Sequence, residues 1–199
     1  MLLSTLFVLT HLLAAGLNPS PSTIAPRQDL QRSRTLRMGP AEPPVSIVRK
    51  GDAAPNFSYQ SHDGRWRHLR DLVDKGAVLL VFAARDHHLV RLERERERLL
   101  DLGVVPVVIL DVKQGAARSQ VRRMELAYTV LADPRNVIAS QFNVVDPITQ
   151  GAIPSWFVID RRRKIRALGR GSLPIQDYPA VAASALALAL PGSALPSAK

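Results

Sequence analysis

The sequence predicts one α/β domain in which a central mixed β-sheet is flanked by helices. Val78–Phe82 and Val104–Leu110 are short continuous apolar runs, the pattern of strands that are covered on both faces. Between these runs, leucines recur at the spacing of one helical stripe: Leu89, Leu92, Leu99 and Leu100. The order strand, helix, strand implies a right-handed parallel crossover. A hairpin later in the chain adds antiparallel strands to the same domain.

The predicted elements begin with a hairpin. Phe57 to Gln60 and Trp66 to Leu69 flank Asp63-Gly64, a dipeptide typical of tight hairpin turns. The leucine helix is expected to end at Gly103, because glycine adopts the left-handed conformation without strain.

The leucine helix also carries a run of alternating Glu and Arg from Glu93 to Arg98. Arg91 and Glu95 are four residues apart, so they are expected to form a weakly stabilising ion pair. We interpret this run as a solvated helix face rather than as a binding site.

The middle of the domain is predicted to contain a strand and two helices. Pro106 has no amide donor, so its strand is expected to start late or to lie towards an edge of the sheet. Gln120 to Leu126 is predicted to be helical. Asp133-Pro134 predicts a further helix start, with Asp133 as N-cap and Pro134 at the first helical position.

The last elements are predicted from apolar patterning. The helix after Pro134 is expected to bury three side chains and to stop at Asn143; the three are Val137, Ile138 and Phe142. Trp156 to Ile159 and Ile165 to Leu168 are predicted to form a hairpin around Arg161–Lys164. A final helix is expected from about Gln176, with its apolar side chains at Val181, Leu186, Leu188 and Leu190.

The composition excludes several kinds of chemistry. The chain has 199 residues, 46% of them apolar, and no cysteine. It can therefore bury a core, but it cannot form a disulfide, a thiolate nucleophile or a Cys-ligated zinc site. The formal net charge of +10 favours anionic surfaces through long-range attraction. No Gly-rich phosphate loop, Gly-x-Ser-x-Gly motif or His-Glu-x-x-His motif is present.

Residues 1–17 are interpreted as a signal peptide or an N-terminal membrane anchor. Their apolar run is followed by Ala14-Ala15-Gly16, which supplies the small residues of a cleavage site. No Lys or Arg precedes the run and His11 lies inside it, so a mis-assigned start upstream of Met38 is the alternative. The first interpretation implies an exported or membrane-tethered protein, and a start at Met38 implies a cytoplasmic one.

The rest of the chain divides into three parts. Residues 18–50 are rich in Pro, Ser and Arg without hydrophobic periodicity, which predicts a flexible linker. Residues 51–190 are predicted to form the α/β domain, and residues 191–199 a short tail.

Several segments of this domain together resemble a known superfamily. They are Gly51–Phe57, Asp63-Gly64, Asp71-Leu72, Leu131–Pro134, Val145–Pro147 and Ile153–Asp160. In this order they resemble the redoxins, which include the alkyl hydroperoxide reductase/thiol-specific antioxidant proteins (peroxiredoxins) and the thioredoxin-like proteins of the bacterial envelope. The resemblance spans Gly51 to about Gly171 and implies a thioredoxin-like fold.

The resemblance fails where the envelope thioredoxin-like proteins carry their two cysteines. Their strand is followed by Trp-Cys-x-x-Cys and then by Arg-x-Glu. Arg91 and Glu93 fit this frame, but His87 and Val90 stand at the two cysteine positions.

The peroxiredoxin frame fails as well. Its Pro-x-x-x-Thr-x-x-Cys corresponds to Ala84, His88 and Arg91, and the family's arginine before the later strand corresponds to Pro154. Peroxide reduction and disulfide exchange both need a sulfur nucleophile. The resemblance therefore implies an inherited scaffold without its thiol reaction.

Two interpretations of the former active-site positions remain open: Asp86, His87, His88, Val90, Arg91 and Pro154. In one, neutral His87 and His88 bind a metal, or free amides at the helix start bind an anion, with a further ligand from His62, His68 or a distant acid. In the other, Asp86 caps the helix and the histidines are exposed polar residues. We favour the second, because adjacent side chains on a helix diverge. Pro154 is expected to follow a cis peptide bond, as the resemblance implies.

The densest cationic cluster is Arg161-Arg162-Arg163-Lys164. It suits anionic lipid or nucleic acid, but no aromatic residues are interleaved for base stacking. We interpret it as a solvated hairpin tip and expect no nucleic-acid partner. Trp156 is interpreted as a core residue.

The sequence thus predicts a cysteine-less redoxin that serves as a binding or scaffolding module, with a protein partner and no cofactor. Its expected contact surface is the former active-site face around Asp86 to Arg91 and Pro154. The alternative is a divergent oxidoreductase or metal carrier that uses His87 and His88. A membrane tether through residues 1–17 is compatible with both.

Overall fold

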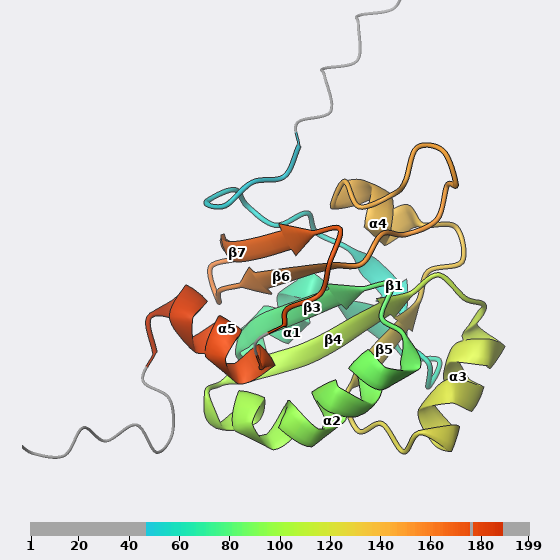
Figure 1. The fold of residues 1–199 in the computed structure, drawn as a ribbon, viewed down its shortest axis with the longest axis horizontal. Helices are drawn as coiled ribbons and strands as arrows, with labels where there is room; N and C mark the ends of the chain where they lie inside the picture. Colours follow the sequence, from blue (N-terminus) through green and yellow to red (C-terminus); the bar gives the residue numbers. More distant parts are fainter. Residues whose placement is uncertain (1–46, 176, 189–199) are drawn as a thin grey trace, which may run out of the picture. The chain divides into compact units, whose positions relative to one another are not determined.

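A five-stranded mixed sheet in the order β5-β4-β3-β6-β7 organises the molecule (Figure 1). The computed structural model describes residues 47–175 and 177–188. β3 lies at the centre, parallel to β4 on one side and antiparallel to β6 on the other. The predicted fold class, a mixed sheet flanked by helices, is confirmed.

The strands and helices follow the predicted alternation, with a separate two-stranded hairpin formed by the first two strands. In chain order the elements are β1 (Ser58–Gln60), β2 (Trp66–His68), α1 (Leu69–Lys75), β3 (Ala77–Phe82), α2 (Asp86–Asp101), β4 (Val104–Leu110), α3 (Gln114–Arg123), β5 (Thr129–Ala132), α4 (Val137–Gln141), β6 (Ser155–Ile159), β7 (Ile165–Arg170) and α5 (Tyr178–Leu186). None of the helices in the described ranges is long and apolar enough to cross a membrane.

Every residue of β3 is buried, because helices cover both of its faces. Leu79 and Val81 face the core formed with α2, α3 and α5, whereas Val78, Leu80 and Phe82 face the core formed with α1 and α4. This is the alternation of a strand, whose successive side chains point to opposite faces. Because both faces of β3 are buried, its sequence is a continuous apolar run.

The α1 and α4 side of the sheet holds a cluster of phenylalanines. The ring centroid of Phe142 lies 5.4 Å from that of Phe82 and 5.0 Å from that of Phe157. Phe57 reaches the same ring at 6.5 Å. The tilted and edge-on arrangements of these rings are those that aromatic pairs prefer.

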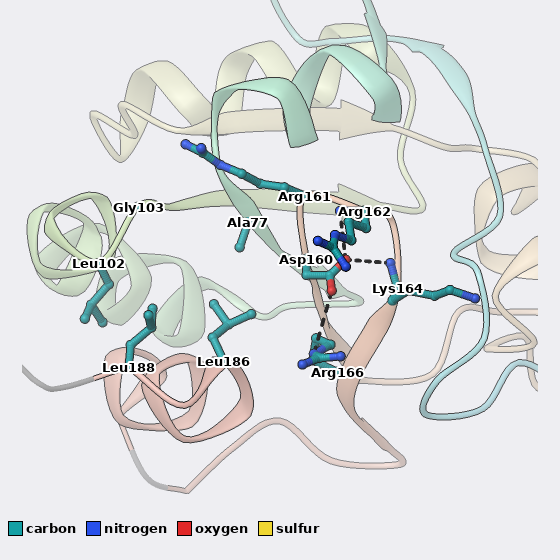
Figure 2. Close-up of a pocket in the computed structure, with 10 residues that line it drawn as sticks. All are labelled: Ala77, Leu102, Gly103, Asp160, Arg161, Arg162, Lys164, Arg166, Leu186 and Leu188. Atoms are coloured by element: carbon teal, nitrogen blue, oxygen red, sulfur yellow. Dashed lines mark hydrogen bonds and ion pairs between the residues drawn. The ribbon is translucent and has the colours of Figure 1, made fainter.

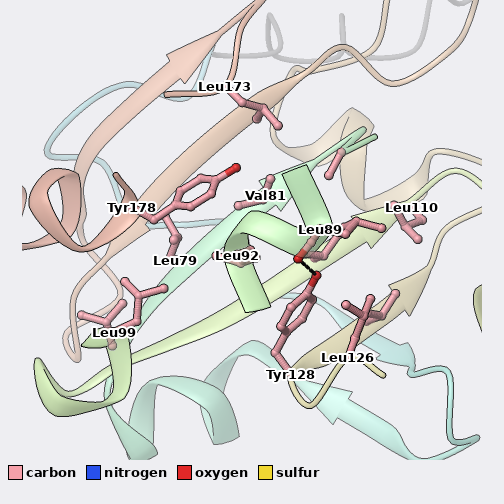
Figure 3. Close-up of a cluster of buried hydrophobic side chains, with 14 of the residues drawn as sticks. Leu79, Val81, Leu89, Leu92, Leu99, Leu110, Leu126, Tyr128, Leu173 and Tyr178 are labelled. Atoms are coloured by element: carbon pink, nitrogen blue, oxygen red, sulfur yellow. Dashed lines mark hydrogen bonds between the residues drawn. The ribbon is translucent and has the colours of Figure 1, made fainter. Parts of the chain in front are cut away.

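The opposite side is an aliphatic core that joins α2 to the sheet (Figure 3). Leu89, Leu92 and Leu99 are fully buried there, as the leucine stripe predicted. The Tyr128 hydroxyl donates to the backbone oxygen of Leu89 at 3.1 Å. Leu100 was expected in this stripe but is 45% exposed, since it is adjacent to Leu99 and points away from the face that Leu99 buries.

One predicted helix has different boundaries, and one helix was missed. α3 spans Gln114–Arg123 rather than Gln120 to Leu126, because Ala117 and Val121, four residues apart, are its buried face. α1 was not predicted. It begins at Leu69, whose amide hydrogen-bonds to Phe57, and it therefore shortens the second hairpin strand to His68.

Asp133 acts at the start of α4, but not as its N-cap. The helix begins at Val137, three residues after Pro134, and Asn136 is its N-cap. The buried Asp133 carboxylate accepts hydrogen bonds from the amides of Val137, Ile138 and Ala139 at 2.8–3.1 Å. An N-cap side chain usually accepts hydrogen bonds from the first amides of its helix. Asp133 does this from a position outside the helix.

Three further expectations about helix burial and helix ends have mixed outcomes. Ile138 and Phe142 are buried as predicted, but Val137 is 44% exposed. Asn143 and Gly103 adopt the predicted left-handed conformation, with φ of 55° and 68°.

Pro106 lies inside a strand that is not at the edge, contrary to both expectations. β4 begins at Val104, two residues before it, and pairs with β3 through Pro106. Pairing with β5 begins only at Val107. Pro106, which has no amide donor, therefore lies in the part of β4 that pairs with β3 but not with β5.

The predicted β6–β7 hairpin around Arg161–Lys164 is confirmed. α5 carries Val181 and Leu186 as predicted, with Leu188 just beyond its end. Gln176 and Leu190 lie outside the described residues.

Gly76 joins α1 to β3 against the backbone of the β4 start. A Cβ at this position would overlap the carbonyl oxygen of Gly103, which is backbone and cannot move aside. We expect Gly76→Ala to lower the free energy of unfolding by about 1–3 kcal/mol through this overlap. Gly115→Ala is the control, because Gly115 lies in α3 with nothing within 4 Å of its added Cβ. Equal unfolding free energies of the two variants in urea titrations would contradict the prediction.

Candidate functional site

The candidate site lies where β3 leads into α2. Ala83 follows β3 with φ of 50°, an uncommon conformation for a residue with a side chain. Ser155 pairs with Phe82, so the preceding Pro154 lies beside this connection. The structure thus brings Pro154 and the start of α2 to the same end of β3, as the sequence predicted.

Pro154 follows a trans peptide bond. Throughout the described ranges no peptide bond is cis, so the expectation from the resemblance is wrong at Ile153–Pro154. Pro154 is half-buried and leads directly into the sheet.

Asp86 does not cap α2. Arg85 is the N-cap residue, and Asp86 is the first residue of the helix. Its carboxylate accepts from the Gln120 side chain at 2.7 Å and lies 3.2 Å from the Arg123 guanidinium. Asp86 therefore ties the start of α2 to α3, and the interpretation of it as the cap is wrong.

The His88 side chain helps to cap the start of α2 through its ring nitrogen Nδ1. The Arg85 amide donates to His88 Nδ1 at 3.3 Å, and the His88 amide donates to the Arg85 carbonyl at 2.9 Å. Burial, followed by the neighbouring charges of His87, Arg91 and Arg85, lowers the pKa of His88. The ring is therefore neutral near pH 7, with its proton on Nε2.

His87 and His88 do not diverge as expected. Their ring centroids are 3.8 Å apart and their planes are inclined by 41°, so the two imidazoles lie in contact at the helix start. His87 is exposed and His88 half-buried. No group of three His, Asp or Glu side chains in the described part of the chain is arranged to hold a metal ion.

Arg91 is held inside a network on the outer face of α2. Its guanidinium lies 3.1 Å from Glu95, donates to the Pro174 carbonyl at 2.9 Å and covers the Tyr178 ring at 4.7 Å. The predicted ion pair with Glu95 is confirmed. Arg91 stands at the cysteine position of the peroxiredoxin frame, so this position now serves to attach the segment before α5.

The alternating charges that follow are only partly the solvated face that was predicted, since Arg94, Glu97 and Arg98 are exposed but the other three are half-buried. Glu95 also accepts the Tyr178 amide at 2.7 Å, and Arg98 pairs with Asp177, the N-cap of α5, at 3.2 Å. Glu93 accepts the Ala127 amide at 2.8 Å. The run fastens α2 to two later segments, and we name the contacts of Arg91, Glu95 and Arg98 the α2–α5 latch. The i, i+4 pair was visible in the sequence, but its distant partners were not.

Tyr178 lies beneath the latch with its ring fully buried (Figure 3). Burial raises the pKa of its hydroxyl to about 12, with opposing contributions from Arg91, which lowers it, and Glu95, which raises it. The hydroxyl has no hydrogen-bond partner among the described residues. Tyr178 is therefore a neutral core residue and does not supply an acid or base near neutral pH.

The exposed part of the site consists of Asp86, His87 and Val90. The two side chains that match the peroxiredoxin frame, His88 and Arg91, are turned to internal contacts. The geometry therefore offers a small surface with a carboxylate, an imidazole and an apolar side chain, held by hydrogen bonds to α3. Such a surface suits contact with another molecule better than it suits nucleophilic chemistry.

Comparisons with known proteins agree with this scaffold. A model of the AhpC/TSA family matches residues 50–168. Solved structures with the same fold include peroxidoxin BcpB from Mycobacterium tuberculosis, with 21% identity, a TM-score of 0.61, and coverage of 70% of this chain and 95% of that one. A PrxQ mutant from Xylella fastidiosa is 13% identical, with a TM-score of 0.62 and coverage of 71% and 97%. No curated protein matches the sequence.

The α2–α5 latch is expected to contribute measurably to stability. Arg91→Met keeps an apolar stem but removes the bonds to Glu95 and Pro174, and we expect the free energy of unfolding to fall by about 1–2 kcal/mol. Hydrogen exchange at the Tyr178 amide should accelerate, since its acceptor Glu95 loses its partner. Arg94→Met, on the exposed side of the same helix, is the control. Indistinguishable unfolding and exchange in the two variants would refute the latch.

Proposed function

The chain belongs to the AhpC/TSA family, and from this we propose that it acts as a binding or scaffolding module without thiol catalysis. The family match covers residues 50–168, and the thioredoxin-like sheet and helices are present. The scaffold is retained, whereas the sulfur that its usual reaction needs is absent from all 199 residues.

One observation carries the proposal: Arg91, which the sequence frame places at the family's thiol position, has a structural task. Arg91 connects α2 to the segment before α5, and His88 caps the helix start. Both side chains support the scaffold rather than face a substrate. A site that had exchanged one nucleophile for another would be expected to hold a reactive group free of such bonds.

The contact surface that we propose is formed by Asp86, His87 and Val90, with Pro154 beside them. Asp86 is fixed by Gln120 and Arg123, and the His87 ring lies against that of His88. Side chains that are already ordered lose little conformational entropy on binding. The mixture of charged, aromatic and apolar groups suits a protein partner.

The test is affinity capture from the source cells with C-terminally tagged full-length protein. The double variant His87→Glu with Val90→Asp should lose the partner that the unaltered protein retains. Arg94→Glu with Leu100→Asp places the same new side chains at exposed positions of α2 outside the surface and should retain it. Retention of the partner by both double variants would rule out this surface.

The same material tests the absence of thiol chemistry. Purified protein should reduce neither hydrogen peroxide nor insulin disulfides above a heat-inactivated control. Clear turnover would overturn the proposal. Its mature N-terminus, read by mass spectrometry, distinguishes the expected export or tethering through residues 1–17 from a start at Met38.

A metal carrier is the second candidate, and the closeness of the two imidazoles, whose centroids are 3.8 Å apart, is the observation in its favour. His88 Nε2 and the His87 ring would supply two nitrogens, with the remaining ligands from a partner or solvent. Stoichiometric Zn²⁺ or Cu²⁺ that is lost in His87→Ala and His88→Ala, but kept in His68→Ala, is the result this function requires. Equal metal content in all three variants would exclude it.

A further inference from the structure

A cavity of about 590 Å³ lies at the opposite end of β3 from the former active site (Figure 2). It is bounded by the start of β3, the end of α2, the β6–β7 hairpin and the end of α5. Its volume is in the range of pockets that hold small molecules. None of the predicted site residues of α2 lines it.

One wall of this cavity is apolar. Leu102, Leu186 and Leu188 lie side by side on it, with Ala77 at the base (Figure 2). Leu188 is 42% exposed although it stands beside two other leucines. Leu102 and Leu186 are half-buried and pack against the aliphatic core, so the apolar surface that they share with the exposed Leu188 in this hollow indicates a place for hydrocarbon.

The other wall carries cations. Arg161, Arg162, Lys164 and Arg166 line it from the β6–β7 hairpin, together with one acid, Asp160. The Asp160 carboxylate accepts the turn amides of Arg162 and Lys164, at 2.9 and 2.8 Å, and lies 3.7 Å from Arg166. The acid is therefore committed to the turn, and the wall keeps a net positive charge.

A second cavity of about 600 Å³ is a neighbour of the first, and Arg166 lines both. Its wall includes Trp156, Val181 and Ala185, and its rim includes Lys50. Trp156 is half-buried, so the expectation of a core residue is only partly met. Its indole lies against Gly169, where a Cβ would overlap it.

We propose that this groove between α5 and the β6–β7 hairpin binds a single anionic amphiphile, a free carboxylate with an acyl chain. The chain lies on the three leucines and extends towards Trp156, and the carboxylate pairs with the cations of the hairpin. Charge-assisted bonds from guanidinium groups to a carboxylate are among the stronger hydrogen bonds in proteins. The leucines are recessed in a concavity, which suits one chain rather than a flat bilayer surface.

This site is independent of the proposed protein-contact surface, which lies at the other end of β3. It also changes the interpretation of Arg161–Lys164. The hairpin tip is exposed, as expected, but it forms one wall of a groove whose other wall is apolar. That apolar wall favours an amphiphile over a nucleic acid, which needs no hydrocarbon surface of this kind.

The experiment uses Trp156 as reporter in the full chain. The sequence has two tryptophans, so Trp66→Phe leaves Trp156 as the single indole. Laurate, added below its micelle concentration, should change the Trp156 emission saturably. Dodecyltrimethylammonium has a chain of the same length with a cationic head, and it should produce no saturable change.

Variants of each wall then locate the site. Arg162→Gln with Lys164→Gln should weaken laurate binding by about tenfold through loss of the charge-assisted bonds, and Leu188→Gln should weaken it through the chain. Arg94→Gln with Arg122→Gln removes the same charge elsewhere, and Leu100→Gln alters an exposed leucine outside the groove. Both controls should bind as the Trp66→Phe protein does.

Three results would each overturn the proposal. They are equal responses to the two amphiphiles, equal affinities of wall and control variants, and a response only to vesicles of anionic phospholipid.

Discussion

The pairing of β3 along both of its edges is the constraint on which the rest of the structure depends. β4 holds one edge and β6 the other, and two cores cover the faces of the strand. A strand in this position cannot shift its register without moving buried side chains to the wrong face. The positions of α2 and Pro154 follow, because α2 leaves the end of β3 and Pro154 precedes the residue that pairs with that end.

The helix that carries the thiol in related folds has a different task in this molecule. A reactive sulfur at a helix start must remain accessible and must avoid bonds that hold it in the scaffold. Arg91 meets neither condition, since it joins Glu95, Pro174 and Tyr178. This face of α2 instead stabilises the attachment of α5. The surface that remains is small, exposed and fixed from α3.

The two ends of β3 offer different chemistry to other molecules. At one end, short polar side chains and Val90 form an exposed surface. At the other, the ends of α2 and α5 place leucines opposite a cationic hairpin and border an open cavity. This difference follows from the connections. At the first end, α2 begins directly after β3. At the second end, the β6–β7 hairpin with its long arginine side chains lies beside the end of α5.

The sequence by itself determined the sheet, the leucine helix, the β6–β7 hairpin and the absence of thiol chemistry. These depend on local periodicity, on turn residues and on composition. Only the tertiary structure decided the partners of Glu95 and Arg98, the remote capping by Asp133, the internal bonds of Arg91 and the groove beside Trp156. Most of these join residues far apart in the chain, such as Glu95 with Tyr178, whereas Asp133 acts over only four to six residues. The spacing of the charged residues predicts that their side chains project from the surface of the helix. Which distant amide each side chain contacts depends on how α5 packs.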